Sequence, residues 1–241
     1  MSLKNIKLVT FDVTNTLLKF KVPAWKYYAM IAQEHGFKGT EDDVKSKFKN
    51  SFKLMWEKHP NYGKNTIKWE DWWRKVVSLT LKDHLPSNAN LDIIANKLIN
   101  EFRSDRCWKI ASGSNKLINE FKKRGIHVGV ISNFDPRLHD ILESVSLLKN
   151  FDFIVTSYEI GYSKPDERIF QSAIAKCSTP VQPSQALHIG DDMLKDYVGA
   201  RAAGWHALLV NPNLEPDSKP SQEHVFKNLE ELRSTNYSEL F

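Results

Sequence analysis

Polar side chains that could carry out chemistry follow predicted strands at four places along this chain of 241 residues. In chain order they are Asp12; Ser132 and Asn133; Lys164; and Asp191, Asp192 and Asp196. A single aspartate after a strand is usually a helix cap or a turn former, and a single lysine is usually solvated. Four such groups in succession indicate one composite site, because ligands of open α/β sheets bind at the carboxyl ends of the strands.

Asp12 and Asp191 suit phosphoryl transfer through a covalent aspartate. A carboxylate such as Asp12 can attack phosphorus and form an acyl phosphate, which divides one difficult displacement into two easier ones. Because the carboxylate and the phosphate are both anions, the reaction needs a metal ion to offset their repulsion. Asp191 provides a second carboxylate for Mg²⁺, which prefers hard oxygen ligands. The sequence therefore predicts Asp12 as the nucleophile and Mg²⁺ as the cofactor.

The other polar groups have supporting roles in this interpretation. Lys164 supplies a positive charge for the phosphoryl oxygens and for Asp12, and Ser132 donates a hydrogen bond to another oxygen. Asp192 and Asp196 are expected to orient metal-bound water or to hold Lys164. Together these residues would surround the nucleophile.

The stretches that precede these groups predict the strands of a parallel sheet. Short, β-rich apolar runs occupy residues 5–11, 126–132, 151–157, 186–191 and 207–210. Apolar residues at helical spacing predict helices over 113–124, 136–148 and 193–203, and a terminal helix over 222–232. Strands that alternate with helices are typical of a parallel sheet covered on both faces. The predicted fold class is therefore α/β, with a doubly wound, Rossmann-like core.

Residues 19–106 are organised differently and predict an inserted helical unit. They contain no convincing strand, and apolar residues recur at helical spacing from Val44 to Met55, from Trp69 to Val77 and from Leu91 to Phe102. We therefore expect a core of residues 1–18 and 107–241 and an all-helical cap over 19–106, with hinges near Phe20–Pro23 and Arg106–Trp108. Several aromatic residues of the cap either pack among its helices, which is the favoured interpretation, or face the site: Trp25, Tyr28, Trp56, Tyr62 and Trp69.

Composition restricts the class of protein. Hydrophobic residues make up 41% and charged residues 26% of the chain, as in ordinary globular proteins. No apolar run approaches the roughly 18 residues that a membrane helix needs, and the N-terminus shows no signal-peptide pattern. The two cysteines, Cys107 and Cys177, cannot form a disulfide framework. A reducing compartment is therefore expected, namely the cytoplasm, with entry into the nucleus left open.

The net charge of +5 is concentrated in the predicted cap. Residues 19–106 hold 17 of the 34 Lys and Arg but only 11 of the 29 Asp and Glu. We interpret this excess as solvated helix faces, with a positive lid that attracts a small anionic substrate as the alternative. A nucleic-acid binder is disfavoured, because the sequence shows no basic stripe with interleaved aromatic residues.

Four motifs resemble those of the haloacid dehalogenase superfamily, in the same order. They are FDVTNTLL, VISNFD, KPDERIF and HIGDDMLKDYVGARAAGW. The resemblance extends over essentially the whole chain and implies that the helical insert is a C1-type cap. It also implies that Asp12 is the nucleophile and that Mg²⁺ is held by Asp12, the backbone carbonyl of Thr14 and Asp191. In detail, DVTNTLL, the tryptophan-rich stretch of the cap and ISNFDPRL are most similar to the group of haloacid dehalogenase-like hydrolase domain-containing protein 3 and rhythmically expressed gene 2-like proteins.

The first motif departs from the phosphatases of the superfamily at two positions. Those phosphatases usually carry a second aspartate two residues after the nucleophile, which protonates the leaving group and then activates water. Thr14 stands there, and a hydroxyl of ordinary pKa cannot supply acid–base catalysis near neutrality, which is commonly worth about 10²–10⁴-fold in rate. Thr at this place is similar to the P-type ATPases, whose aspartyl phosphate persists. Asn15 replaces the usual glycine, but asparagine tolerates a left-handed backbone better than most residues.

These observations predict a Mg²⁺-dependent phosphatase acting on a small phosphorylated metabolite, with Thr14 and Asn133 in contact with the substrate. The alternative is a slow or inactive member of the superfamily with a binding or regulatory role, because Thr14 replaces the acid–base residue. Dehalogenase chemistry is disfavoured, since the dehalogenases that the chain resembles need no metal, carry a Tyr at the position of Thr14 and lack the arrangement found at Gly190–Asp192. No membrane partner is expected, and the sequence indicates neither the particular substrate nor an oligomeric state.

Overall fold

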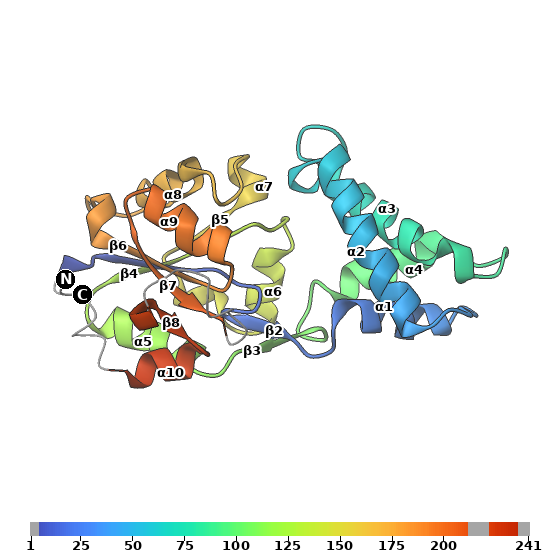
Figure 1. Ribbon diagram of the computed structural model, residues 1–241, viewed down its shortest axis with the longest axis horizontal. Helices are drawn as coiled ribbons and strands as arrows, with labels where there is room; N and C mark the ends of the chain where they lie inside the picture. The colour runs from blue at the N-terminus through green and yellow to red at the C-terminus, as the bar shows by residue number, and fades with distance from the viewer. Residues whose placement is uncertain (1–4, 212–221, 236–241) are drawn as a thin grey trace. The chain divides into compact units, whose positions relative to one another are not determined.

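The computed structural model describes residues 5–211 and 222–235, and the chain divides into two compact units. The first, here called the core unit, consists of Met1–Lys19 and Lys109–Phe241. The second, here called the helical unit, consists of Phe20–Trp108. Figure 1 shows that the sheet belongs to the core unit, whereas the helical unit is built from packed helices.

A six-stranded parallel sheet forms the centre of the core unit. Its strands, in spatial order, are β5 (Phe153–Thr156), β4 (His127–Ser132), β1 (Leu8–Phe11), β6 (Ala186–Gly190), β7 (His206–Val210) and β8 (Val225–Phe226). The strand order reverses at β1, which lies between β4 and β6. Such a reversal is where doubly wound sheets bind their ligands. The predicted α/β, doubly wound fold class is confirmed.

Burial on both faces explains why such short stretches form strands. Every residue of β1 and β6 is buried, and parallel strands covered by helices read as nearly continuous apolar runs. Two polar residues interrupt this pattern, Thr10 in β1 and His188 in β6. They lie opposite each other in the parallel register and are fully buried. Buried polar groups need hydrogen-bond partners, and both of these belong to the network of the candidate site.

Helices cover both faces of the sheet. On one face lie α5 (Ser114–Lys123) and α10 (Leu229–Ser234), and on the other lie α8 (Glu167–Ile174) and α9 (Gly199–Ala202) (Figure 1). Two further helices, α6 (Leu138–Ser144) and α7 (Ser157–Ile160), follow β4 and β5. A π-helical turn, η6 (Met193–Val198), leads from β6 into α9. The helices thereby cover both faces of the sheet, and the loops after the strands lie at its carboxyl edge.

The helices of the core unit depart from the sequence prediction at several places. α6 ends at Ser144, short of residue 148, because Ser146 adopts a left-handed backbone with φ of 61°, which an α-helix does not accommodate. The helix predicted over 193–203 begins as the π-helical η6, and the one predicted over 222–232 is the shorter α10, preceded by β8. The sequence analysis does not predict α7 or α8 at all.

The helical unit contains four α-helices, in agreement with the all-helical character predicted for this segment. They are α1 (Ala24–Gln33), α2 (Glu41–Lys58), α3 (Trp69–Leu81) and α4 (Leu91–Glu101). α2 begins at a capping box: the Thr40 side chain accepts from the Asp43 backbone N–H, and the Asp43 side chain accepts from the Thr40 backbone N–H. This arrangement satisfies two backbone donors that a helix start would otherwise leave unpaired.

Seven of the 14 aromatic side chains of the helical unit are buried, and the other seven are partly exposed. Trp72 is fully buried, and its indole N–H lies 3.2 and 2.9 Å from two backbone carbonyls at the C-terminal end of α2. Of the five aromatic residues whose role the sequence leaves open, Tyr28, Tyr62 and Trp69 are buried and thus pack as favoured. The side chains of Trp25 and Trp56 are partly exposed.

Two short strands, β2 (Leu18–Phe20) and β3 (Trp108–Ile110), form a separate two-stranded sheet and contain the two chain crossings between the units. The sequence analysis places no strand within residues 19–106, so β2 corrects it at Lys19 and Phe20. A strand of three residues is too short to show the alternation by which strands are predicted.

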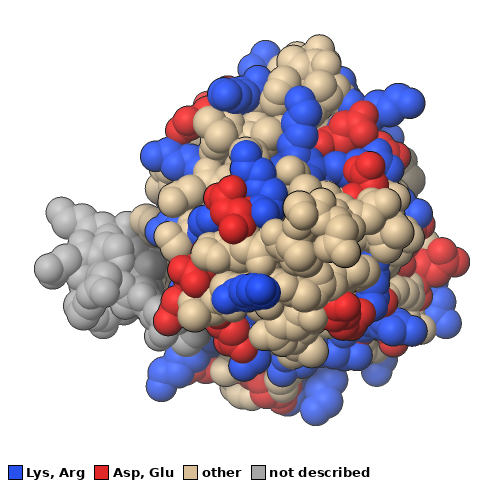
Figure 2. Space-filling model, turned by 90° about the vertical axis from the view of Figure 1, so that its right-hand side faces the viewer, with Lys and Arg blue, Asp and Glu red and all other residues tan. Residues whose placement is uncertain are grey.

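The charged side chains of both signs are interspersed on the face of the molecule shown in Figure 2, with no continuous basic stripe on that face. Within the part of the chain that the structure describes, no helix is both long and apolar enough to span a bilayer.

Candidate active site

Asp12 leads from β1 into a tight loop at the carboxyl end of the sheet. Its backbone N–H donates to the Ile189 carbonyl of β6 at 2.9 Å, which extends the strand pairing by one residue. The loop then turns back, because Asn15 adopts a left-handed backbone with φ of 63° and the Leu18 N–H bonds the Val13 carbonyl at 2.8 Å. Asparagine therefore takes the turn position where glycine is usual, as expected from the sequence.

The Asp12 carboxylate is held through one of its two oxygens. Lys164 Nζ lies 2.7 Å from Oδ1, and Ser132 Oγ donates to the same oxygen at 3.1 Å. None of the described residues donates a hydrogen bond to Oδ2. Burial raises the pKa of Asp12, and the nearby Lys164 ammonium offsets part of this rise. One oxygen of a buried, oriented carboxylate is thus open to a metal ion or to phosphorus.

Lys164 is the buried cation at the centre of the site. Its Nζ lies 2.7 Å from Asp12 Oδ1, 2.6 Å from Asp196 Oδ1 and 2.8 Å from the Ile131 carbonyl of β4. These three acceptors match the three N–H bonds of an ammonium group. Burial by itself would lower the pKa of Lys164, but the carboxylates of Asp12 and Asp196 together outweigh burial and raise it. Lys164 is therefore charged at neutral pH.

Asp196 reaches the site from η6 and is held by three donors. Oδ1 lies 2.6 Å from Lys164 Nζ and 3.2 Å from His188 Nε2, and Oδ2 accepts the Asp192 N–H at 2.9 Å. The carboxyl group fills the space where Gly190 lacks a side chain, since a Cβ there would lie 2.2 Å from Asp196 Cγ. Burial would raise the pKa of Asp196, but Lys164 and His188 hold it below its ordinary value. Asp196 is therefore ionised and fully bonded.

Asp191 is the least compensated carboxylate of the site. Asn15 Nδ2 donates to its Oδ2 at 3.2 Å, and the Asn211 side chain donates to its backbone carbonyl at 3.0 Å. Burial, followed by the charges of Asp12 and Asp196, raises the pKa of Asp191 to about 7. Burial and the two neighbouring carboxylates therefore disfavour the ionised form of Asp191 more than Lys164 and Asn15 favour it.

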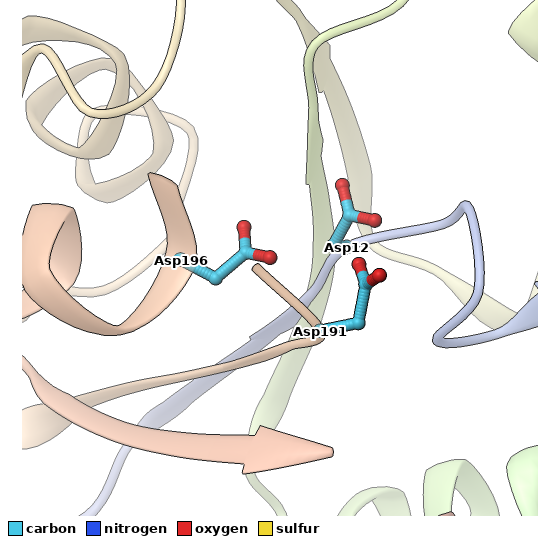
Figure 3. Close-up of side chains that lie close together, drawn as sticks. All are labelled: Asp12, Asp191 and Asp196. Carbon is cyan, nitrogen blue, oxygen red and sulfur yellow. The ribbon is translucent and has the colours of Figure 1, made fainter. Parts of the chain in front are cut away.

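The carboxyl groups of Asp12, Asp191 and Asp196 converge on one small space, and one oxygen from each lies within 4.8 Å of the others (Figure 3). Because Asp196 is already occupied by three donors, the oxygens that suit a divalent cation belong to Asp12 and Asp191. Two carboxylates that leave room for water and phosphate oxygens match the preference of Mg²⁺. The donor set and its excess of negative charge therefore fit the predicted metal.

Thr14 and Asn133, the two residues expected to contact the substrate, differ in what they bond. Thr14 lies in the loop after Asp12 and is partly exposed, and no described residue bonds its hydroxyl group. The side chain of Asn133 bonds both backbone groups of Lys164 instead. Asn133 therefore fixes the segment that carries Lys164.

Asp192 and Asp196 were expected to act alike, but the structure separates them. Asp196 holds Lys164 as predicted, whereas the side chain of Asp192 accepts two backbone N–H groups and caps η6. The sequence analysis misses Thr10 and His188, which stand behind Asp196. The sequence feature that could have indicated these two residues is a polar side chain in the middle of an otherwise apolar strand.

Comparison of the sequence with known proteins shows the family of the chain. The sequence profile of the haloacid dehalogenase-like hydrolases matches residues 6–204. The chain belongs to this family. It is 37% identical to haloacid dehalogenase-like hydrolase domain-containing protein 3 of Bos taurus, over 94% of this chain and 92% of that protein. It is 36% identical to rhythmically expressed gene 2 protein of Drosophila melanogaster, over 87% of this chain and 85% of that protein.

A solved structure has the same fold as this chain. The magnesium-bound HAD-hydrolase YfnB of Bacillus subtilis superposes with a TM-score of 0.73 at 20% identity, over 95% of this chain and 97% of that one. The resemblance read from the four motifs is therefore confirmed for the haloacid dehalogenase-like hydrolase family and for its fold. In this chain, the acidic cluster of Asp12, Asp191 and Asp196 lies where the strand order of the sheet reverses.

Proposed function

We propose that this chain is a Mg²⁺-dependent phosphatase that acts on a small phosphorylated metabolite through an aspartyl-phosphate on Asp12. The observation that supports this most strongly is the state of the Asp12 carboxylate. Lys164 and Ser132 hold Oδ1, while Oδ2 accepts no hydrogen bond from a described residue. A buried carboxylate that is oriented through one oxygen and open at the other suits nucleophilic attack on phosphorus.

In this proposal Asp12, Asp191 and the backbone carbonyl of Thr14 hold Mg²⁺. The ion, when bound, offsets the charges of the nucleophile and of the phosphoryl group. Asp196 remains with Lys164, whose ammonium stabilises the negative charge around phosphorus. Ser132 donates to Asp12 in the free protein and can turn to a phosphoryl oxygen when substrate is present.

The chemistry divides into two steps. In the first, an Asp12 oxygen forms a bond to phosphorus while the bond from phosphorus to the leaving oxygen breaks. The leaving oxygen must then gain a proton, which Thr14 cannot give near neutrality. In the second step a water oxygen forms a bond to phosphorus while the bond from phosphorus to the Asp12 oxygen breaks, which releases inorganic phosphate and restores the carboxylate. No carboxylate at position 14 is present to accept the water proton. The first step should therefore be slow unless the leaving group is a weak base, and the second step should be slow for every substrate, because all substrates give the same aspartyl-phosphate.

The second candidate function is a binding or regulatory role with slow or absent turnover. Thr14 is the observation that favours it, because the acid–base group is missing while the nucleophile, the lysine and the metal-binding carboxylates are in place. Under this alternative the chain would bind Mg²⁺ and a phosphorylated ligand, and Asp12 would retain any phosphoryl group that it captured.

A metal-dependent screen of phosphorylated metabolites, with Asp12→Asn as the matched control, tests the proposal. The variant keeps the size of the side chain but cannot form an acyl phosphate. We expect phosphate release that requires Mg²⁺, stops when the metal is chelated and is absent from Asp12→Asn. Retained Mg²⁺ binding without hydrolysis of any compound would favour the binding role. Halide release from a 2-haloacid without metal would overturn both.

The proposal also assigns a role and a location to the rest of the chain. Residues 19–106 would act as the cap that selects substrate, with hinges near Phe20–Pro23 and Arg106–Trp108. Neither Cys107 nor Cys177 forms a disulfide bond with a described residue, which supports a reducing compartment such as the cytoplasm.

A further inference from the structure

A buried histidine extends the site inward from Lys164. His188 on β6 and Thr10 on β1 face each other across the parallel register, and both are fully buried. Thr10 Oγ1 and His188 Nδ1 are 2.8 Å apart, and His188 Nε2 lies 3.2 Å from Asp196 Oδ1. Asp196 in turn lies 2.6 Å from Lys164 Nζ. The four side chains form a continuous row of polar contacts that ends at Lys164.

The chemistry of these groups fixes the direction of each hydrogen bond. An ionised carboxylate can only accept hydrogen bonds, so His188 Nε2 carries the proton and donates a hydrogen bond to Asp196. Burial, with the Lys164 charge nearby, lowers the pKa of His188, so the ring is neutral. Its Nδ1 is then an acceptor, and the Thr10 hydroxyl group donates a hydrogen bond to it. His188 therefore offers Asp196 one N–H bond and no positive charge.

This N–H bond controls how strongly Asp196 attracts Lys164. The same oxygen, Oδ1, accepts from both His188 and Lys164. If His188 no longer donates, Oδ1 is left with the ammonium as its one donor among the described residues, and a buried carboxylate that loses a donor is costly. Asp196 would then draw Lys164 away from Asp12, which competes for the same ammonium group.

We propose that His188 is a positioning residue that, by donating to Asp196, keeps the Lys164 ammonium shared between Asp196 and Asp12. Thr10 holds the imidazole in the tautomer that this role requires. The consequence for turnover rests on the proposed function, in which Asp12 is the nucleophile. The consequence for the position of Lys164 does not depend on that function.

Two conservative substitutions of His188 separate this role from simple packing. In His188→Gln the amide nitrogen can take the place of Nε2 and donate to Asp196. In His188→Asn the shorter side chain places its amide near the position of Nδ1, where it reaches Thr10 but not Asp196. The two variants are similar in polarity, so they differ mainly in whether Asp196 keeps its donor. His206→Asn on β7, where the histidine bonds the Ser184 carbonyl, controls for loss of a histidine in the same sheet.

The first measurement is the kinetics of an activated aryl phosphate with Mg²⁺. We expect His188→Gln and His206→Asn to remain close to wild type. In His188→Asn we expect kcat to fall on the order of 10–100-fold, as for loss of a hydrogen bond to a charged group. KM should change little, because His188 does not line the open side of Asp12. Melting temperatures of all variants establish that the folded state is retained.

The second measurement reports on Lys164 without any reaction. A buried, fully bonded ammonium group exchanges its protons slowly, so its ¹⁵N–¹H signal should be visible in wild type and assigned by its absence in Lys164→Met. We expect the signal to persist in His188→Gln and to be lost or shifted in His188→Asn. If wild type hydrolyses no phosphate, the proposed function fails, and this comparison alone decides the role of His188. If the Gln and Asn variants behave alike, whether both match wild type or both lose the Lys164 signal, the positioning role of His188 is overturned.

Discussion

The side chain of Asn133 brackets the backbone of Lys164: its carbonyl oxygen accepts the Lys164 N–H at 2.7 Å, and its amide nitrogen donates to the Lys164 carbonyl at 2.9 Å. Asn133 directly follows Ser132 at the end of β4. The pair therefore ties the segment that carries the cation to the strand that carries a hydrogen-bond donor for Asp12, and the two functional groups cannot move independently.

Replacing Asn133 with alanine should leave both backbone groups of Lys164 without these partners. We expect the free energy of unfolding to fall by about 1–3 kcal/mol. Phosphatase activity should fall by more than the loss of folded protein explains, because Lys164 loses its fixed distance from Asp12. Thermal melting and steady-state kinetics measure the two effects. Asn115→Ala on α5, whose side chain makes only a long contact of 3.5 Å with Asn150, is the matched control. Wild-type kinetics in Asn133→Ala would show that Lys164 is held by its ion pairs alone.

The raised pKa of Asp191 predicts how the metal-free protein responds to pH. Between the ordinary value of 3.8 and about 7, the folded protein keeps a proton on Asp191 that the unfolded chain has lost. The contribution of this group to the free energy of unfolding therefore falls as pH rises through that window. Asp191→Asn should raise the melting temperature of the metal-free protein at about pH 8 but not at about pH 4. An increase that is the same at both pH values would contradict the assigned pKa.

Metal binding should be coupled to the same proton. Mg²⁺ needs the ionised form of Asp191, so below about pH 7 each bound ion must displace one proton. We expect the observed affinity for Mg²⁺ to fall by about tenfold for each unit of pH below this value. Calorimetric titration in two buffers of different ionisation enthalpy measures the released proton directly. Asp191→Ala should bind Mg²⁺ far more weakly, and an unchanged affinity in that variant would place the metal elsewhere.

The presence of Thr14 predicts that the rate of substrate cleavage depends on the leaving group of the substrate. Because no carboxylate at position 14 supplies a proton, wild type should cleave an activated aryl phosphate much faster than an alkyl phosphate, and the aspartyl-phosphate on Asp12 should decay slowly. Thr14→Asp should raise turnover of the alkyl phosphate on the order of 10²-fold if the new carboxylate reaches the leaving oxygen. Thr14→Asn controls for size without adding an acid. Fast wild-type turnover of the alkyl phosphate, with no gain in Thr14→Asp, would mean that another group donates the proton.

Lys164→Met should destabilise the fold as well as abolish activity. It removes the one ammonium group between Asp12 and Asp196, and breaking a buried ion pair costs about 3–5 kcal/mol. The double variant Lys164→Met with Asp196→Asn also removes a negative charge, so it should regain part of the lost melting temperature while staying inactive. A double variant no more stable than the single one would show that repulsion between these carboxylates is not the source of the loss.

Much of the site follows from the sequence because parallel strands end at one edge of a sheet. Asp12, Ser132 and Asp191 each stand at the end of a predicted strand, and the structure brings them together for that reason. Spacing alone does not distinguish Asp192, which caps η6, from Asp196, which bonds Lys164, since both are aspartates just after β6. That difference depends on the π-helical turn and on the space beside Gly190, and neither leaves a pattern in the sequence.

Other features are hidden because their cause is tertiary. Thr10 and His188 occupy strand positions that resemble any polar interruption of an apolar run, and their pairing appears only when β1 and β6 are placed in register. α6 ends early because Ser146 adopts a left-handed backbone. Serine rarely adopts this conformation, so the sequence does not predict it. The strands β2, β3 and β8 are too short for periodicity to reveal.

The position of β1 between β4 and β6 affects the order in which contacts of the sheet can form during synthesis. The strand that carries Asp12 precedes the other strands in the sequence, and the residues that complete its surroundings are distant: Lys164 follows Asp12 by 152 positions, and His188 follows Thr10 by 178. The contacts among α1–α4, by contrast, lie within one intervening segment of the chain. During synthesis β1 is therefore produced before β4 and β6, and Asp12 can contact Ser132 and Lys164 only after the segment of α1–α4 has been made.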